Sequence, residues 1–292
     1  MLYDIAASID YTYQQPSALG RTVLRLLPAS IPGVQRLIAG TLTAQPLSDE
    51  RIDRVDFFGN AVTEIAWRGT GREARFKVQA RVERLARPPE LDLSPPLSGL
   101  AAAIRAWPDL GPEAPHHFLG PSERVRPTAT MTAFARDLVT PQMTVLAAVE
   151  AIGRALYEDM RFDASATTVD TDPMEAFTAR HGVCQDFSHI MIACLRGVGI
   201  PAAYVSGYLR TLPPPGQERL AGADAMHAWV RAWCGPDLGW VEFDPTNDLL
   251  VAGDHILVAV GRDYHDVSPV KGVLRTAGRQ ASHHGVDVIP LG

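Results

Sequence analysis

The sequence predicts an α+β protein, in which an N-terminal antiparallel β domain precedes a core of helices packed on an antiparallel sheet. Three observations support this fold class. The first 90 residues show repeated alternation of apolar and polar side chains, which is typical of half-buried strands. Residues 145–198 instead carry apolar side chains at spacings of three and four, which is typical of helices. Strand-like runs then follow at 202–208, 227–233 and 240–243.

Residues 1–90 are expected to form a β-rich accessory domain, either a sandwich or a similar arrangement. The alternation is clearest at residues 9–13 and 75–85, and residues 22–27 are predicted to be a separate strand. Gly59-Asn60 predicts a turn between two further strands. This part of the sequence holds no cluster of chemically reactive side chains, so its expected role is accessory.

A proline-rich linker is expected at residues 91–130, before a catalytic domain at residues 131–292. Nine of the 23 prolines lie between residues 88 and 127, and a short helix is expected near 97–107. The catalytic domain is predicted to begin with a helix that has one apolar face, formed by Val145, Val149, Ile152 and Leu156.

Capping signals set the next helix boundaries. Asp172-Pro173 combines an N-cap acid with proline at the first helical position, which predicts a short helix that stops near Gly182. A new helix is expected to begin at about Cys184 and to end at Gly199-Ile200-Pro201. Residues 212–225, with three successive prolines, are expected to form a long loop.

Composition narrows the class of protein. With 46% hydrophobic residues and 21% charged residues, the chain can bury a substantial core. A formal net charge of -6 gives no indication of binding to nucleic acid or to an anionic membrane. No apolar run is long enough for a transmembrane helix, and we expect no secretory signal. The three cysteines lack CxxC spacing, which argues against a disulfide framework or a zinc site and favours the cytoplasm.

Cys184 is the expected nucleophile. At the N-terminus of a helix, free N–H groups and the positive end of the helix dipole stabilise a thiolate. The backbone N–H of Cys184 is also a candidate oxyanion donor. The other two cysteines, Cys194 and Cys234, are expected to be buried and inert.

His227 and Asp244 are the expected base and orienting carboxylate, and strand geometry supports their pairing. If Trp233 and Trp240 face each other across a hairpin, Asp244 pairs with Trp229, two residues along from His227. Residues two apart on a strand share a face, so the two side chains are separated by a diagonal of roughly 7 Å. A slip of one residue would place them on opposite faces.

Other polar residues are assigned structural roles. Asp186 is expected to cap the helix or bind backbone, and His189 is expected to lie on another helix face. His283-His284 is expected to lie in a solvated tail, because Asp287 is the only acid nearby and no set of metal ligands is complete. We therefore predict no metal and no cofactor.

Several motifs together resemble the bacterial transglutaminase-like cysteine hydrolase family. They are the stretches 182–189, beginning Gly-Val-Cys-Gln-Asp-Phe, 199–202, 204–208, 227–230, 239–247 and 261–269. Phe58-Gly59-Asn60 is similar to the β-rich domain that precedes this core in bacterial members. The resemblance implies a papain-like core and a Cys-His-Asp triad at Cys184, His227 and Asp244. Ala203 departs from the pattern, since arginine is expected there, and is expected to alter a wall of the cleft.

The expected function is that of a cytoplasmic thiol protease or amidase acting on a peptide, amide or isopeptide bond. One alternative is a transglutaminase, which transfers the acyl group to an amine. Another, from a different class, is a non-catalytic binding or scaffold module. Some relatives are associated with ATP-grasp ligase-type proteins, so such a partner is implied by the resemblance alone. The substrate, the second oxyanion donor and the oligomeric state are left open.

Overall fold

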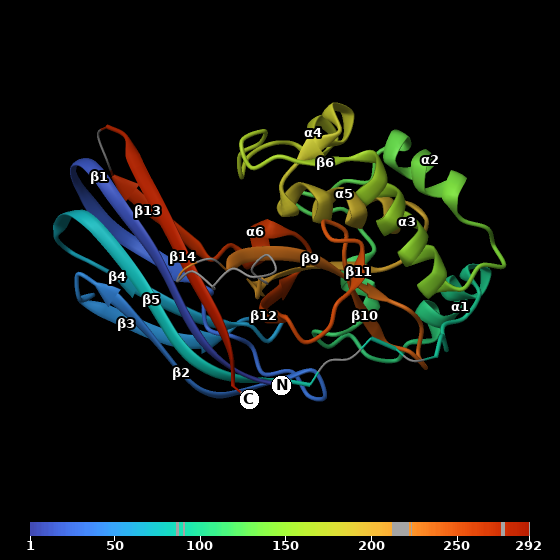
Figure 1. Cartoon of the computed structure of the whole chain (residues 1–292), viewed down its shortest axis with the longest axis horizontal. Helices are drawn as coiled ribbons and strands as arrows, with labels where there is room; N and C mark the ends of the chain where they lie inside the picture. The colour runs from blue at the N-terminus through green and yellow to red at the C-terminus, as the bar shows by residue number, and fades with distance from the viewer. Residues whose placement is uncertain (86–87, 90, 212–221, 223, 276–277, 292) are drawn as a thin grey trace, which may run out of the picture.

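The computed structural model describes residues 1–85, 88–89, 91–211, 222, 224–275 and 278–291. Two antiparallel sheets dominate these residues, and the helices gather beside the second sheet (Figure 1). The first sheet has the order β2-β5-β1-β4-β3, with β13 and β14 also paired to β1. Its strands are β1 (Leu2–Leu24), β2 (Gln35–Gln45), β3 (Glu50–Val55), β4 (Ala61–Ala66), β5 (Thr70–Arg84), β13 (Val270–Arg275) and β14 (Gln280–Leu291).

Strand β1 organises the first sheet. Its first half lies between β5 and β14, and its second half pairs with β4 and β13. The sequence predicts separate strands at 9–13 and 22–27, whereas the structure has one strand of 23 residues with an irregular register after Thr12. Alternate side chains, including Tyr3, Ile5 and Ile9, are buried on one face, as the two-residue period requires.

The second sheet has the order β11-β10-β9-β8-β12. Its strands are β8 (Ala202–Leu209), β9 (Ala225–Trp233), β10 (Trp240–Asp244), β11 (Leu249–Leu250) and β12 (His255–Gly261). Two short strands, β6 (Arg161–Phe162) and β7 (His181–Gly182), pair separately in parallel. Most of the expected loop at 212–225 lies outside the described residues, and β9 begins at Ala225.

The helices are α1 (Leu97–Ala106), η1 (Pro115–Phe118), α2 (Ala129–Leu138), α3 (Val145–Asp159), α4 (Pro173–Ala179), α5 (Cys184–Gly197) and α6 (Tyr264–Val267). Helix α5 contacts β9, β8 and the neighbouring helices, and it is buried along nearly its whole length. The predicted cap at Asp172, whose carboxylate accepts from the Met174 N–H, is confirmed, as is the end of α5 before Gly199 at φ +84°. Among the described residues, no helix is long and apolar enough to cross a membrane.

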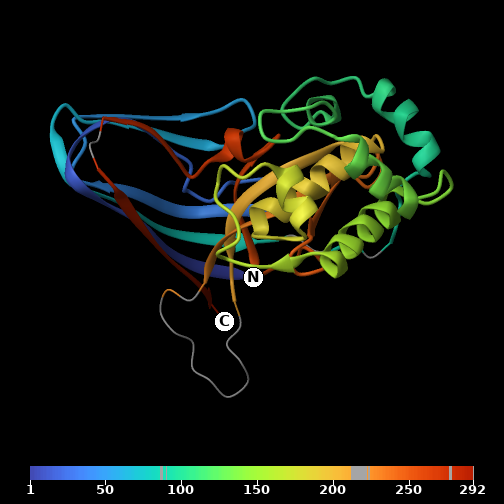
Figure 2. The same ribbon diagram turned by 90° about the horizontal axis from the view of Figure 1, so that it is seen from above.

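The structure differs from the expected organisation at two places, the linker and the C-terminal strands. The expected linker at 91–130 holds α1 and η1, and these pack on the core: the Trp107 ring lies 5.5 Å from that of Trp233. The expected catalytic domain at 131–292 includes β13 and β14, but their hydrogen bonds place both strands in the N-terminal sheet. The chain thus returns to its starting sheet, and Figure 2 shows β14 running beside β1.

Side-chain amides of the N-terminal part cap the outer edge of the second sheet. Gln35 donates to the Leu257 carbonyl at 2.7 Å and accepts from its N–H at 2.9 Å. Asn60 makes the same pair of bonds with Val260, at 2.8 and 2.7 Å. Buried backbone groups on an edge strand would otherwise lack hydrogen-bond partners. These amides therefore satisfy the free edge of β12 and also hold the two sheets together.

Candidate active site

Cys184 is the first residue of α5, as the sequence predicts. The turn before it is tight because Asp186 reaches back: its Oδ2 accepts from the Val183 N–H at 2.8 Å and from the Thr167 hydroxyl at 2.6 Å. A Cβ at Gly182 would lie 2.7 Å from that carboxylate oxygen, so the approach requires glycine. The expected capping role of Asp186 is therefore confirmed, and the thiol lies at the positive end of the helix.

The register that brings His227 and Asp244 together is also confirmed. Trp240 pairs with Trp233, and the ladder continues to Phe243 opposite Val230. His227 Nε2 lies 2.8 Å from Asp244 Oδ2, and both residues are buried. The strand pairing thus places an imidazole and a carboxylate in direct hydrogen-bond contact.

Asp244 is held by more donors than the sequence suggests. His255 Nε2 lies 3.0 Å from Oδ2, and the Asn247 amide donates to the same oxygen at 2.7 Å. The Thr246 N–H donates to Oδ1 at 2.9 Å. The Asp244 side chain is fully buried, so these four hydrogen bonds replace its hydration and fix its orientation.

His255 reaches Asp244 from the far edge of the sheet, across β8 and β9. Gly207 of β8 lies between the two strands that carry His255 and His227, and a Cβ there would lie 2.4 Å from the Trp229 ring, so glycine leaves room for that ring. The Trp229 and His255 rings are 5.1 Å apart in an edge-on contact. No local sequence signal identifies His255, because the contact depends on how β12 is added to the sheet.

The protonation states follow from these contacts. Burial disfavours the charged form of Asp244, but hydrogen bonds from His227 and His255 outweigh it and lower the pKa of the carboxyl below its usual range. Burial also opposes charge on His227, yet hydrogen bonds to Asp244 and Cys184 and their charges raise its pKa to about 10. Because Nε2 of His227 donates to Asp244, Nδ1 is the nitrogen available to the Cys184 thiol.

Among the described residues, His227, Asp244 and His255 form a group that could hold a metal ion. The ligand atoms of His227, Asp244 and His255 all lie within 4.8 Å of one another. Hydrogen bonds of 2.8 and 3.0 Å to one carboxylate oxygen account for this convergence. Since both imidazoles use Nε2 as donors to Asp244, the arrangement fits an imidazole–carboxylate network.

The remaining cysteines and His189 have structural environments. Cys194 and Cys234 are fully buried, and burial raises the pKa of the Cys194 thiol to about 12. His189 is buried, accepts from the Tyr264 N–H at 3.1 Å and contacts the Tyr204 ring at a tilt of 40°. Burial lowers its pKa to about 3, so it remains neutral.

The structure corrects two expectations about polar and cleft residues. His283 and His284 are exposed, as expected, but they lie in β14, paired with Asp10 and Ile9, and not in a tail. Sheet pairing with β1 orders this segment. Ala203 is fully buried in a cluster with Val205 and Trp229, and it does not line the cavity beside Cys184.

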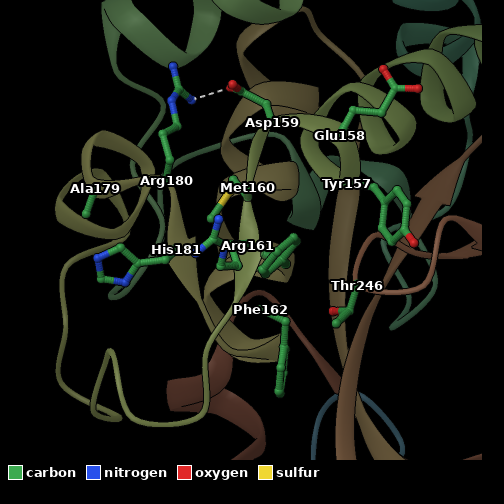
Figure 3. Close-up of a pocket in the computed structure, with 11 residues that line it drawn as sticks. Tyr157, Glu158, Asp159, Met160, Arg161, Phe162, Ala179, Arg180, His181 and Thr246 are labelled. Atoms are coloured by element: carbon green, nitrogen blue, oxygen red, sulfur yellow. Dashed lines mark ion pairs between the residues drawn. The ribbon is translucent and has the colours of Figure 1, made fainter.

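Two of the hollows lie near the N-terminal end of α5. The smaller one, of about 220 Å³, is lined by both Cys184 and His227. The larger one, of about 890 Å³, contains neither residue (Figure 3). Its rim carries Arg180, paired with Asp159 at 2.7 Å, together with Arg161 and His181. Because the thiol and imidazole open into the smaller hollow, that is where a bound carbonyl would meet both.

Two family profiles match this chain. The profile of the transglutaminase-like superfamily matches residues 132–245, and that of the bacterial transglutaminase-like N-terminal region matches residues 3–83. The first match contains Cys184, His227 and Asp244. The second match ends one residue before Arg84, the last residue of β5.

Whole-length relatives support the same grouping. An uncharacterized protein of Mycobacterium tuberculosis is 34% identical over 280 residues, covering 88% of this chain and 83% of the relative. One of Mycobacterium leprae is 29% identical over 279 residues, covering 94% and 93%. A solved structure from Cytophaga hutchinsonii, described as a candidate cysteine protease, covers 100% of this chain and 91% of its own, with a TM-score of 0.76 and 22% identity. The expected α+β fold is confirmed by this likeness.

Proposed function

This chain belongs to the transglutaminase-like superfamily, and from that premise we propose that it is a cysteine-dependent hydrolase of amide, peptide or isopeptide bonds. One observation carries the proposal: the His227–Asp244 hydrogen bond of 2.8 Å lies beside a thiol at a helix N-terminus, and both open into one cavity. This geometry supports the assignment of Cys184 as nucleophile, His227 as base and Asp244 as orienting group.

Acylation begins from a Cys184 thiolate beside a protonated His227, the state in which the thiol proton already resides on the imidazole. The thiolate then attacks the carbonyl carbon, and the carbonyl π electrons move to oxygen, where the Cys184 N–H stabilises the negative charge. Collapse of this intermediate breaks the C–N bond while the His227 imidazolium gives its proton to the leaving amine. The product is a thioester, and Asp244 holds the imidazole in one tautomer throughout.

Deacylation uses the same groups in reverse. His227 takes a proton from water, the hydroxide adds to the thioester carbonyl, and the C–S bond breaks. The thiolate is again left beside a protonated His227, and the acyl group leaves as a free acid. An amine in place of water would give the transglutaminase outcome, which is the alternative reaction at the same site.

A substrate screen tests the proposal. Amide, peptide and isopeptide libraries would be incubated with wild type, Cys184→Ala and the matched control Cys194→Ala, with mass spectrometry of the products. Cleavage is expected in wild type and Cys194→Ala and should be lost in Cys184→Ala. Equal turnover in Cys184→Ala would remove this thiol from the reaction, and a folded wild type without turnover on any library would favour the scaffold alternative.

A second arm separates hydrolysis from transfer. The cleaved substrate would be offered with millimolar primary amine, and free acid and amine adduct would be weighed. Free acid is expected to dominate. A dominant amine adduct would replace the hydrolase with an acyltransferase.

We also propose a cytoplasmic location, because all three cysteines are unpaired and a reducing compartment keeps the Cys184 thiol available. Cell fractionation with an antibody would check it. An ATP-grasp ligase remains a predicted partner, and co-purification from cells would test that association.

A further inference from the structure

We propose that the hollow beside Cys184 is a substrate subsite built jointly by the two sheets, and that it accepts one uncharged, apolar side chain next to the scissile carbonyl. The inference rests on the proposed function and names a substrate class for it. It also gives the N-terminal sheet a direct part in substrate binding.

Both sheets supply the walls of this subsite. The N-terminal sheet contributes Ile9 and Tyr11 from β1, Val270 from β13 and His284 from β14. The core contributes the residues around the thiol and imidazole, which are Val169, Val183, Cys184, Gln185, Tyr204, Ser206, Met226, His227, Ala228, Tyr264 and Pro269. Removing the N-terminal wall would therefore leave the hollow open on one side.

The N-terminal wall is fixed in place next to His227. The Asp224 N–H donates to the Val286 carbonyl at 3.1 Å, and the Val288 N–H donates to the Asp224 carboxylate at 2.6 Å. These bonds join β14 to the residue that precedes β9. His284 Nδ1 also lies 3.4 Å from the Met226 sulfur, so the wall touches the strand that carries the base.

Beyond the catalytic pair, the lining carries no charged group. It contains no Asp, Glu, Lys or Arg, and aliphatic and aromatic side chains dominate it. Burial raises the pKa of Tyr11 to about 12 and lowers that of His284 below its usual value, so both stay neutral near pH 7. A basic substrate side chain would lose its hydration here without meeting a carboxylate, whereas an apolar one loses nothing.

The size of the hollow indicates one side chain rather than a whole ligand. Its volume of about 220 Å³ lies below the roughly 300–1,000 Å³ that is usual for complete small-molecule sites. Aromatic walls from Tyr11, Tyr204 and Tyr264 favour a flat or branched apolar group through area burial and ring contacts.

Alkylation of Cys184 by reagents of different side groups tests the subsite without a known substrate. N-benzyl iodoacetamide would be compared with iodoacetamide, with the alkylated residue identified by peptide mapping. In wild type, the benzyl reagent should label Cys184 roughly tenfold faster than iodoacetamide, with saturation. In Tyr11→Ala, the ratio of the two labelling rates should fall several-fold.

Two histidine variants provide a matched pair that preserves the core. His284→Ala should weaken the benzyl preference, whereas His283→Ala, whose residue pairs with Asp10 and does not line the hollow, should retain it. If iodoacetamide labels Cys184 but the benzyl reagent labels it no faster, in wild type and variants alike, the subsite proposal is overturned and the hydrolase proposal survives. If iodoacetamide prefers Cys194 or Cys234 in folded protein, both proposals are overturned.

Discussion

His255 Nε2 lies 3.0 Å from Oδ2 of Asp244, the same oxygen that His227 contacts at 2.8 Å. Two imidazoles, one from the central strand β9 and one from the edge strand β12, therefore share a single buried carboxylate oxygen. The hydrogen bond from His255 helps to fix the carboxylate and, together with that from His227, lowers its pKa. His255 thus acts on the reaction through Asp244 and is a positioning residue.

Replacing His255 by alanine should lower kcat roughly tenfold to a hundredfold and change KM much less, because orientation of His227 is lost while substrate contacts remain. His255→Gln, which retains an N–H donor of similar reach, should recover part of the rate. Steady-state kinetics with a cleavable substrate would measure both variants, and thermal melts would confirm folding. An unaltered kcat in folded His255→Ala would show that Asp244 needs no second imidazole.

Asp244→Asn should retain the fold but lose turnover by roughly 10² to 10⁴, the range known for disrupted triad carboxylates. The amide cannot stabilise the His227 imidazolium, so the alkaline limb of kcat/KM should also move to lower pH. A pH–rate profile of wild type and variant measures both effects. Full activity in correctly folded Asp244→Asn would exclude this carboxylate from the mechanism.

The raised pKa of His227 predicts a specific pH dependence of stability. Its folded-state pKa of about 10 exceeds the ordinary value of 6.5, so the protonated imidazole stabilises the folded state fully below pH 6.5. This contribution should be lost as the pH rises from 6.5 through 10. Urea unfolding of wild type and His227→Gln at pH 6, 8 and 10.5 should show a stability difference that shrinks with pH. A difference that grows with pH would contradict the assignment.

The central hairpin of the site could be predicted because a short connection fixes its register. Gly235 and Gly239 adopt positive φ in the turn, so Trp233 and Trp240 meet and Asp244 follows on the face of His227. Helix capping at Asp186 was similarly local. These features depend on residues close in sequence, where turn and cap chemistry leave a readable pattern.

The features that sequence patterns do not predict depend on contacts between residues far apart in the sequence. Strand β14 joins β1 although 267 residues separate Tyr13 from its partner Gln280 (280 − 13), and neither strand carries a signal for that choice. His255 meets Asp244 only because β12 occupies the far edge of the second sheet. Alternation predicts that a strand exists and which face it buries, but it does not choose the neighbour.

The amide of Asn60 links the two sheets, and its loss should destabilise the whole fold. In Asn60→Ala the buried N–H and carbonyl of Val260 would lose their partners, which costs about 1–3 kcal/mol for each unsatisfied group. Urea denaturation should therefore show a stability loss of a few kcal/mol, because Asn60 also bonds Asp56 at 3.1 Å. Thr12→Ala, at an exposed position of β1, is the control and should remain within about 0.5 kcal/mol of wild type. If Asn60→Ala unfolds at the same urea concentration as the control, the edge of β12 does not need this cap, and the Gln35 amide and the apolar contacts between the two sheets are sufficient to hold them together.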